Sequence, residues 1–185
     1  MESLQNYFLI AMPSLDDPGF NRSVIYVCEH NQEGAMGLVV NQPAEMNVME
    51  LLERTKVEPR EGVGLERQPV YAGGPVATDR GFVLHSPQQG WRSSLQLSDN
   101  MMITTSMDIL ESLGSDAAPG HYLLTVGYAG WDAGQLEEEL ADNSWWTIPA
   151  DPEIIFHTPS SERWQKATEQ LGIDIWQLAP QAGRA

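Results

Sequence analysis

Short segments rich in β-branched and aromatic residues, each bounded by turn-forming residues, recur along the chain and restrict its fold class. Such side chains fit a pleated sheet, whereas Gly, Pro, Asn and Asp favour the turns between strands. The best-defined unit has an extended run at 23–30, turn residues at 31–34 and a returning run at 35–40, which together predict a β-hairpin. Further strands are expected over residues 7–12, 70–72, 81–85, 94–97, 101–104 and 121–127.

Helices are expected after the strands rather than in regular alternation with them. Residues 47–54 begin with an Asn N-cap and carry apolar residues at helical spacing. Asp132 with Gln135 resembles a second capping box, which places residues 128–131 at a strand-to-helix junction. Other helices are expected over 107–113 and 159–171, a loop over 55–68, and core-facing apolar runs at 145–148 and 154–156. This order favours an α+β fold with a mixed or antiparallel sheet.

The length and charge of the chain limit what it can bind. A chain of 185 residues is expected to form one domain over residues 1–185. Its net charge is −16, from 26 acidic and 10 basic residues, and its lysines are Lys56 and Lys166. A nucleic-acid binder neutralises phosphates with Lys and Arg, so direct binding to nucleic acid or to an anionic membrane is disfavoured.

The N-terminal segment and the cysteine content indicate a compartment. Glu2 stands where a secretion signal carries positive charge, and the apolar run at 7–12 is too short for such a signal. No run approaches the roughly 18 apolar residues of a membrane span. The single cysteine, Cys28, cannot form an intrachain disulfide. A soluble, reduced, cytoplasmic protein is therefore expected.

Cys28, Glu29 and His30 form a sequence cluster with the chemistry of a nucleophile, an acid and a base. On a strand, however, Cys28 and His30 share one face at a backbone separation of about 6.6 Å, so direct pairing would require His30 to lean strongly or a partner from another strand. A buried structural cysteine is the preferred interpretation, and no catalytic residue is assigned. The histidines lie on separate predicted elements, so the pattern predicts no metal site.

A ligand site is predicted where permissive backbone, a rare cation and aromatic residues combine. A glycine-rich turn beside an arginine can hold an anion, although tight turn chemistry also explains the glycines, and the arginine can instead pair with Asp79. The tryptophan at the 128–131 junction can line a pocket or fill the core. The predicted ligand-binding residues, expected to border one cleft, are Gly73, Gly74, Arg80, His85, Tyr128 and Trp131.

Several motifs along nearly the whole chain resemble those of the YqgE/AlgH family of bacterial proteins. They are FLIAMP at 8–13, RSVIYVCEHN at 22–31, GAMGLVVN at 34–41, GGPV at 73–76, DRGFVLH at 79–85, GYAGW at 127–131 and GQLE at 134–137. The resemblance implies a compact α+β domain with a strongly curved mixed sheet, partly barrel-like and flanked by helices. It implies no established reaction, and the label of transcriptional regulator given to some members is not a demonstrated DNA-binding mechanism.

The charge and the absence of a credible catalytic set favour a binding or regulatory module over an enzyme. Such a module would act through a protein or small-molecule partner, without a cofactor, and would affect gene expression only indirectly. The alternative is a hydrolase-like or thiol-dependent enzyme that uses Cys28, His30 or His85. Convergence of those three side chains within hydrogen-bonding reach would favour the enzyme.

Overall fold

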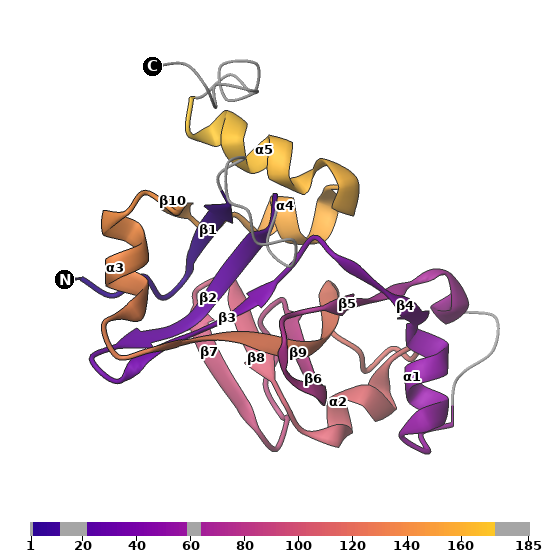
Figure 1. The fold of residues 1–185 in the computed structure, drawn as a ribbon. Coiled ribbons are helices and arrows are strands. Elements are labelled where there is room, and N and C mark those ends of the chain that lie inside the picture. Colours follow the sequence, from indigo (N-terminus) through magenta and orange to yellow (C-terminus); the bar gives the residue numbers. More distant parts are fainter. Residues whose placement is uncertain (1, 12–21, 59–63, 173–185) are drawn as a thin grey trace. The chain divides into compact units, whose positions relative to one another are not determined.

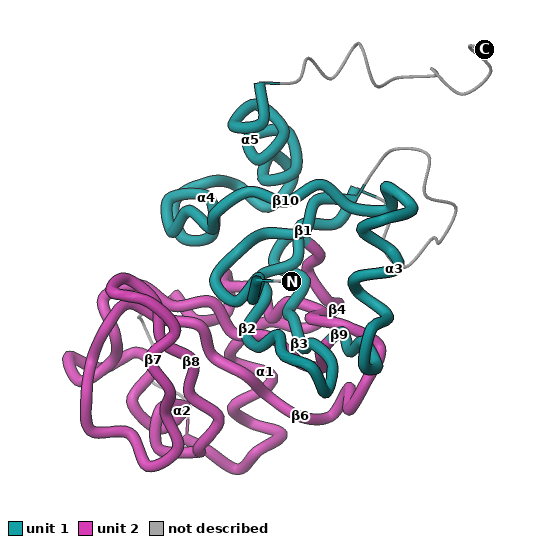
Figure 2. Tube along the Cα trace, turned by 90° about the vertical axis from the view of Figure 1, so that its left-hand side faces the viewer, with its two compact units in different colours: residues 1–41, 129–185 teal, residues 42–128 magenta. Residues whose placement is uncertain are grey.

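The computed structural model describes residues 2–11, 22–58 and 64–172 (Figure 1). The chain divides into two compact units, shown in Figure 2. Unit 1 combines both ends of the chain, residues 1–41 and 129–185, and unit 2 is the intervening stretch, residues 42–128. The strand β9 (Tyr122–Asp132) runs from unit 2 into unit 1. A single domain over residues 1–185 stays a prediction.

Unit 1 is built on an antiparallel sheet in the order β10-β1-β2-β3, followed by the end of β9. Its own strands are β1 (Tyr7–Ala11), β2 (Val24–Asn31), β3 (Gly34–Val39) and β10 (Trp145–Pro149). Its helices are α3 (Gln135–Ala141), α4 (Pro152–His157), the 3-10 turn η2 (Ser160–Glu162) and α5 (Arg163–Gln170). A register shift between Val27 and Glu29 places a bulge in β2, and bulges bend and twist the strands that contain them.

Unit 2 contains a mixed sheet, because β5 pairs in parallel with β9 whereas its other strand pairs are antiparallel. Its strands are β4 (Pro43–Asn47), β5 (Pro69–Ala72), β6 (Val76–His85), β7 (Ser94–Ser98) and β8 (Met101–Thr104), together with the first part of β9. Its helices are α1 (Val48–Arg54), the 3-10 turn η1 (Leu65–Arg67) and α2 (Met107–Ser112).

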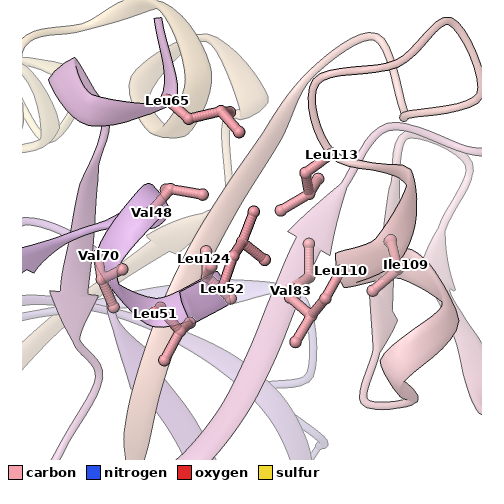
Figure 3. Packing of buried hydrophobic residues seen from close by; sticks show 10 residues of the cluster. All are labelled: Val48, Leu51, Leu52, Leu65, Val70, Val83, Ile109, Leu110, Leu113 and Leu124. Atoms are coloured by element: carbon pink, nitrogen blue, oxygen red, sulfur yellow. The ribbon is translucent and has the colours of Figure 1, made fainter. Parts of the chain in front are cut away.

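The core of unit 2 forms where helix residues meet the sheet. Leu52 of α1 and Leu110 of α2 pack with Val83 of β6 and Leu124 of β9 (Figure 3). Each of these side chains is at least nine-tenths buried, and burying a leucine or valine contributes roughly 1.5–3 kcal/mol. β6 and β9 both contribute to this core, and both strands supply residues of the candidate site described below.

The α+β class, the mixed sheet and the 31–34 hairpin turn are confirmed, since β2 and β3 pair across that turn. The predicted junction at 128–131 is wrong, because these residues lie inside β9: Tyr128 pairs with Val76 of β6, and residues 129–132 pair with β3 as far as Gly34↔Asp132. Helix α3 starts only at Gln135. The apolar run at 154–156 forms α4, with Ile154 and Ile155 buried as expected. Residue 12 of the first predicted strand lies outside the described residues.

Candidate functional site

Arg80 lies in a bulge of β6 that the pairing with β9 creates. The two strands pair at Val76↔Tyr128 and again from Gly81↔Val126, so five steps along β6 correspond to two along β9. Residues 77–80 therefore leave the regular ladder, and Ala77 has a positive φ of 48°. The strand is exposed over 76–80 and buried over 82–85. The bulge thus presents Arg80 to solvent next to a firmly packed strand.

Phe82 forms a platform under the arginine. The Arg80 guanidinium carbon lies 5.6 Å from the Phe82 ring centroid, within the range of a cation–π contact. The Tyr128 ring meets the same phenylalanine edge-to-face at 5.8 Å and 78°. Phe82 was not among the predicted ligand-binding residues, although it stands only two residues after Arg80.

The polar ends of Arg80 and Tyr128 have no protein partner in the part of the chain that the structure describes. The ion pairs formed there are His30–Glu137, Arg92–Asp108 and Lys166–Glu169. The alternative ion pair of Arg80 with Asp79 is therefore not formed. An exposed guanidinium offers up to five N–H donors in a planar fork, which suits carboxylate and phosphate groups.

The glycine-rich turn lies beside Tyr128 because of close backbone approach. The Gly73 N–H donates to the Val126 carbonyl at 2.8 Å. A Cβ on Gly73 would stand 2.4 Å from the Gly127 oxygen, and one on Gly127, where φ is 78°, would stand 2.3 Å from the Gly74 oxygen. Such contacts require glycine at these positions. Backbone packing therefore explains both Gly73 and Gly127 without a ligand, and it brings the turn next to the strand that carries Tyr128.

His85 is fully buried, and both of its ring nitrogens are engaged inside unit 2. Its Nδ1 lies 2.7 Å from the Ser86 carbonyl oxygen, which can only accept, so Nδ1 carries the proton. Its Nε2 then accepts from the Thr104 hydroxyl at 2.7 Å, and that hydroxyl lies 2.8 Å from Ser94 Oγ. Burial lowers the pKa of the imidazole, partly opposed by the hydrogen bond to Ser86, so the ring is held neutral. His85 therefore has a structural network rather than an open nitrogen.

Trp131 belongs to the core of unit 1. It is 7% exposed, and its ring packs edge-to-face on Trp145 at 6.2 Å. The indole N–H groups of both tryptophans donate to Glu139 Oε1, at 3.0 and 2.8 Å. Of the six predicted ligand residues, Gly73, Gly74, Arg80 and Tyr128 are thus linked within unit 2, whereas His85 and Trp131 have internal roles.

The proposed nucleophile and base make separate contacts in unit 1. The Cys28 thiol lies 3.9 Å from the Tyr26 carbonyl oxygen, and burial raises its pKa, with a further contribution from Glu29. His30 Nδ1 accepts from the Leu4 N–H at 3.0 Å, and its Nε2 lies 3.4 Å from Glu137 Oε1. Both imidazole nitrogens therefore have partners other than the thiol. No group of His, Cys, Asp and Glu within the described ranges could hold a metal ion.

Comparison with known proteins gives the family directly. The model of the AlgH-like family, DUF179, matches residues 8–176. The chain belongs to the AlgH-like family. Among full-length relatives, the UPF0301 protein IL2218 of Idiomarina loihiensis is 62% identical and the UPF0301 protein PSHAa2600 of Pseudoalteromonas translucida is 56% identical, each over 100% of both chains. The resemblance to the YqgE/AlgH family is confirmed.

Solved structures agree with this membership. The solution structure of the AlgH protein from Pseudomonas aeruginosa matches with a TM-score of 0.82 and 45% identity, over 99% of this chain and 96% of that chain. The crystal structure of protein DIP2367 from Corynebacterium diphtheriae matches with a TM-score of 0.73, over 92% and 87% of the two chains, and at 20% identity it shows a shared fold. In the described parts of this AlgH-like chain, no helix is long and apolar enough to cross a bilayer.

Proposed function

We propose that this AlgH-like protein is a cytoplasmic binding module that recognises an anionic group of a small-molecule or protein partner. The site consists of Arg80, Phe82 and Tyr128 beside the Gly73–Gly74 turn. The observation that carries the proposal is Arg80, an exposed arginine held on an aromatic ring with no carboxylate partner among the described residues. In a chain with 26 acidic residues, such an arginine is well suited to an external anion.

The surroundings of Arg80 define the class of ligand. The planar guanidinium suits a carboxylate or a phosphate, and the half-buried Tyr128 adds an aromatic wall and a hydroxyl. The net charge of −16 repels free anions at long range, so binding depends on short-range contacts. A ligand that joins an anionic group to an apolar or aromatic part therefore fits better than inorganic phosphate.

A regulatory role would follow from partner binding rather than from contact with DNA. The enzyme alternative receives no support from the geometry, because His30 and His85 direct both ring nitrogens to other groups and the Cys28 thiol is buried.

Backbone and arginine side-chain NMR signals of the labelled protein can test the site. The titrants are inorganic phosphate, acetate, phenylphosphate and benzoate. We expect saturable shifts of the Arg80 Nε–H and the Gly74 amide, with at least about tenfold tighter binding of the aromatic anions, a difference of about 1.4 kcal/mol. Arg80→Ala should abolish the saturable shifts and Arg80→Lys should weaken them, because lysine lacks the bidentate fork.

Arg67→Ala is the matched control, since Arg67 is another exposed arginine of unit 2. It removes the same charge elsewhere and should leave the titrations unchanged. Equal losses of anion affinity in Arg80→Ala and Arg67→Ala would show that the effect comes from the net charge of the protein and not from a site at Arg80. Absence of saturable shifts at Arg80 for every titrant would refute the anion site.

A further inference from the structure

Strand β7 leaves one edge of the unit 2 sheet open. It pairs with β8, and no described strand pairs with its other side (Figure 1). Ser94, Leu95 and Gln96 are all exposed. Leu95 is 59% exposed, the highest value among the large hydrophobic residues that stand out on the described surface. An exposed strand edge with an apolar side chain is a template for pairing with another strand.

The hydrogen-bond register identifies the peptide groups that face outward. The Thr105 N–H donates to the Ser93 carbonyl, and Leu95 is the next residue of β7 with the same orientation, opposite Ile103. Because orientation alternates along an antiparallel ladder, Ser94 and Gln96 point their N–H and C=O groups away from β8. These groups have no backbone partner within the described residues.

The edge lacks two features that commonly prevent pairing, charged residues and proline. No residue between Arg92 and Asp99 is charged, and none is proline. A register shift between Gln96 and Ser98 ends the regular alternation of outward-facing peptide groups, and the Leu97 side chain is buried, with 7% exposure. The pairing-competent edge is therefore a short segment centred on Leu95.

We propose that β7 is a self-association edge that pairs antiparallel with β7 of a second copy, with the two-fold axis at Leu95. In this register Ser94 of each copy pairs with Gln96 of the other, which satisfies all four outward N–H groups of the two strands. The two Leu95 side chains then face each other at the non-hydrogen-bonded position, where opposing side chains are closest.

Charge at the ends of the strand favours a second copy over an arbitrary strand. Antiparallel pairing brings the Arg92 end of one β7 next to the Asp99 end of the other. The Arg92 side chain is 70% exposed, and its ion pair with Asp108 is long, at 3.7 Å. The paired segment is nevertheless short, so the dimer belongs to the weak class of interfaces below about 1,200 Å².

Cysteine cross-linking tests this register directly. Opposing non-hydrogen-bonded residues have Cα atoms about 4.5 Å apart, within the range of a disulfide. Leu95→Cys should therefore cross-link readily under mild oxidation. Gln96→Cys is the matched control, because it is equally accessible but would face Ser94 of the other copy, with the two introduced cysteines more than about 7 Å apart. The native Cys28 is buried and should stay unreacted in both variants.

Sedimentation velocity supplies an independent readout. The wild-type sedimentation coefficient should rise between about 0.02 and 1 mM protein, as weak association requires. Gln96→Pro removes an outward N–H without breaking a bond to β8, so it should stay monomeric while keeping the wild-type circular dichroism spectrum. Equal cross-linking of Leu95→Cys and Gln96→Cys, or a wild-type protein that stays monomeric throughout, would overturn self-association and leave a strand of another protein as the occupant to test.

Discussion

Cys28 shows how the environment of one residue decides its chemistry. The thiol is 4% exposed, and burial raises its pKa, so the thiolate required for nucleophilic attack is scarce at neutral pH. We expect native Cys28 to react with iodoacetamide at least about tenfold more slowly than a cysteine in a short peptide at pH 7.5. Reaction faster than the peptide would indicate an activated thiolate and revive the enzyme hypothesis.

Replacement of Cys28 tests the same conclusion through stability. Cys28→Ser places a hydroxyl in a buried site where the acceptor of the thiol, the Tyr26 carbonyl, lies 3.9 Å from the sulfur. The free energy of unfolding should fall by about 1–3 kcal/mol, measured by urea denaturation. Glu29→Gln is the control, because Glu29 is the exposed neighbour of Cys28 and its loss should change stability by less than about 0.5 kcal/mol. A Cys28→Ser variant as stable as Glu29→Gln would contradict this packing role.

His85 should make the stability of the protein depend on pH. Its folded-state pKa is lowered by burial, so the unfolded chain, with an ordinary value near 6.5, takes up a proton more readily. The stabilisation by the neutral ring is complete above that value and is lost as pH falls below about 6.5 toward the folded-state pKa. Between pH 7.5 and pH 5.5 the free energy of unfolding, measured with urea, should therefore fall more for the wild type than for His85→Gln. Identical losses would contradict a neutral buried ring.

At the scale of elements, the close approach between β9 and the Gly73–Gly74 turn depends on Gly127. Gly127→Ala would combine a φ of 78° with a Cβ only 2.3 Å from the Gly74 oxygen. Gly134→Ala is the control, because Gly134 has a φ of 80° and nothing within 4 Å of the added Cβ. Backbone strain should lower the free energy of unfolding of both variants by about 1 kcal/mol. The clash should lower that of Gly127→Ala by roughly 1–3 kcal/mol more. Equal losses in chemical denaturation would show that the close approach does not matter.

Elements with local signals could be predicted from the sequence, and α1 is the best case. Asn47 caps this helix as expected, since its side chain accepts from the Glu50 N–H at 2.8 Å. The extension of β9 through residues 129–132 could not be predicted, because its partner β3 is about 95 residues away along the chain. Strand β4 was missed for a similar reason: it begins with Pro43 and pairs only with β5.

The candidate site was predictable only in part, because local sequence signals identified some of its residues but did not specify their tertiary contacts. Arg80 stood out because basic residues are scarce, and the glycine turn stood out by composition. The bulge that exposes Arg80 depends on where β6 and β9 pair, which no local pattern specifies. His85 and Trp131 were assigned to the site from composition and an expected junction. Their burial, by the Thr104 network and by Trp145, depends on tertiary packing.

At the scale of the whole molecule, the net charge of −16 sets what the protein can approach. Duplex DNA should not bind at physiological salt, because phosphate contacts require clustered cations. Fluorescence anisotropy with a labelled duplex of mixed sequence should show no saturable signal up to about 10 µM protein, a concentration within the range of typical nonspecific dissociation constants at physiological salt. Sub-micromolar binding at about 0.15 M salt would contradict this expectation and place a basic surface where the charge pattern predicts none.

The pairing of β1 with β10 also sets an order of events during translation. The ribosome makes Tyr7 142 residues before its partner Pro149, whereas β2 and β3 follow β1 closely. At about 5–20 residues per second, roughly 7–28 seconds pass between the synthesis of β1 and that of β10. During that interval the edge of β1 that receives β10 is open on the nascent chain, next to the apolar run Phe8, Leu9 and Ile10. This edge is therefore a place where chaperones would act before the last fifth of the chain has emerged.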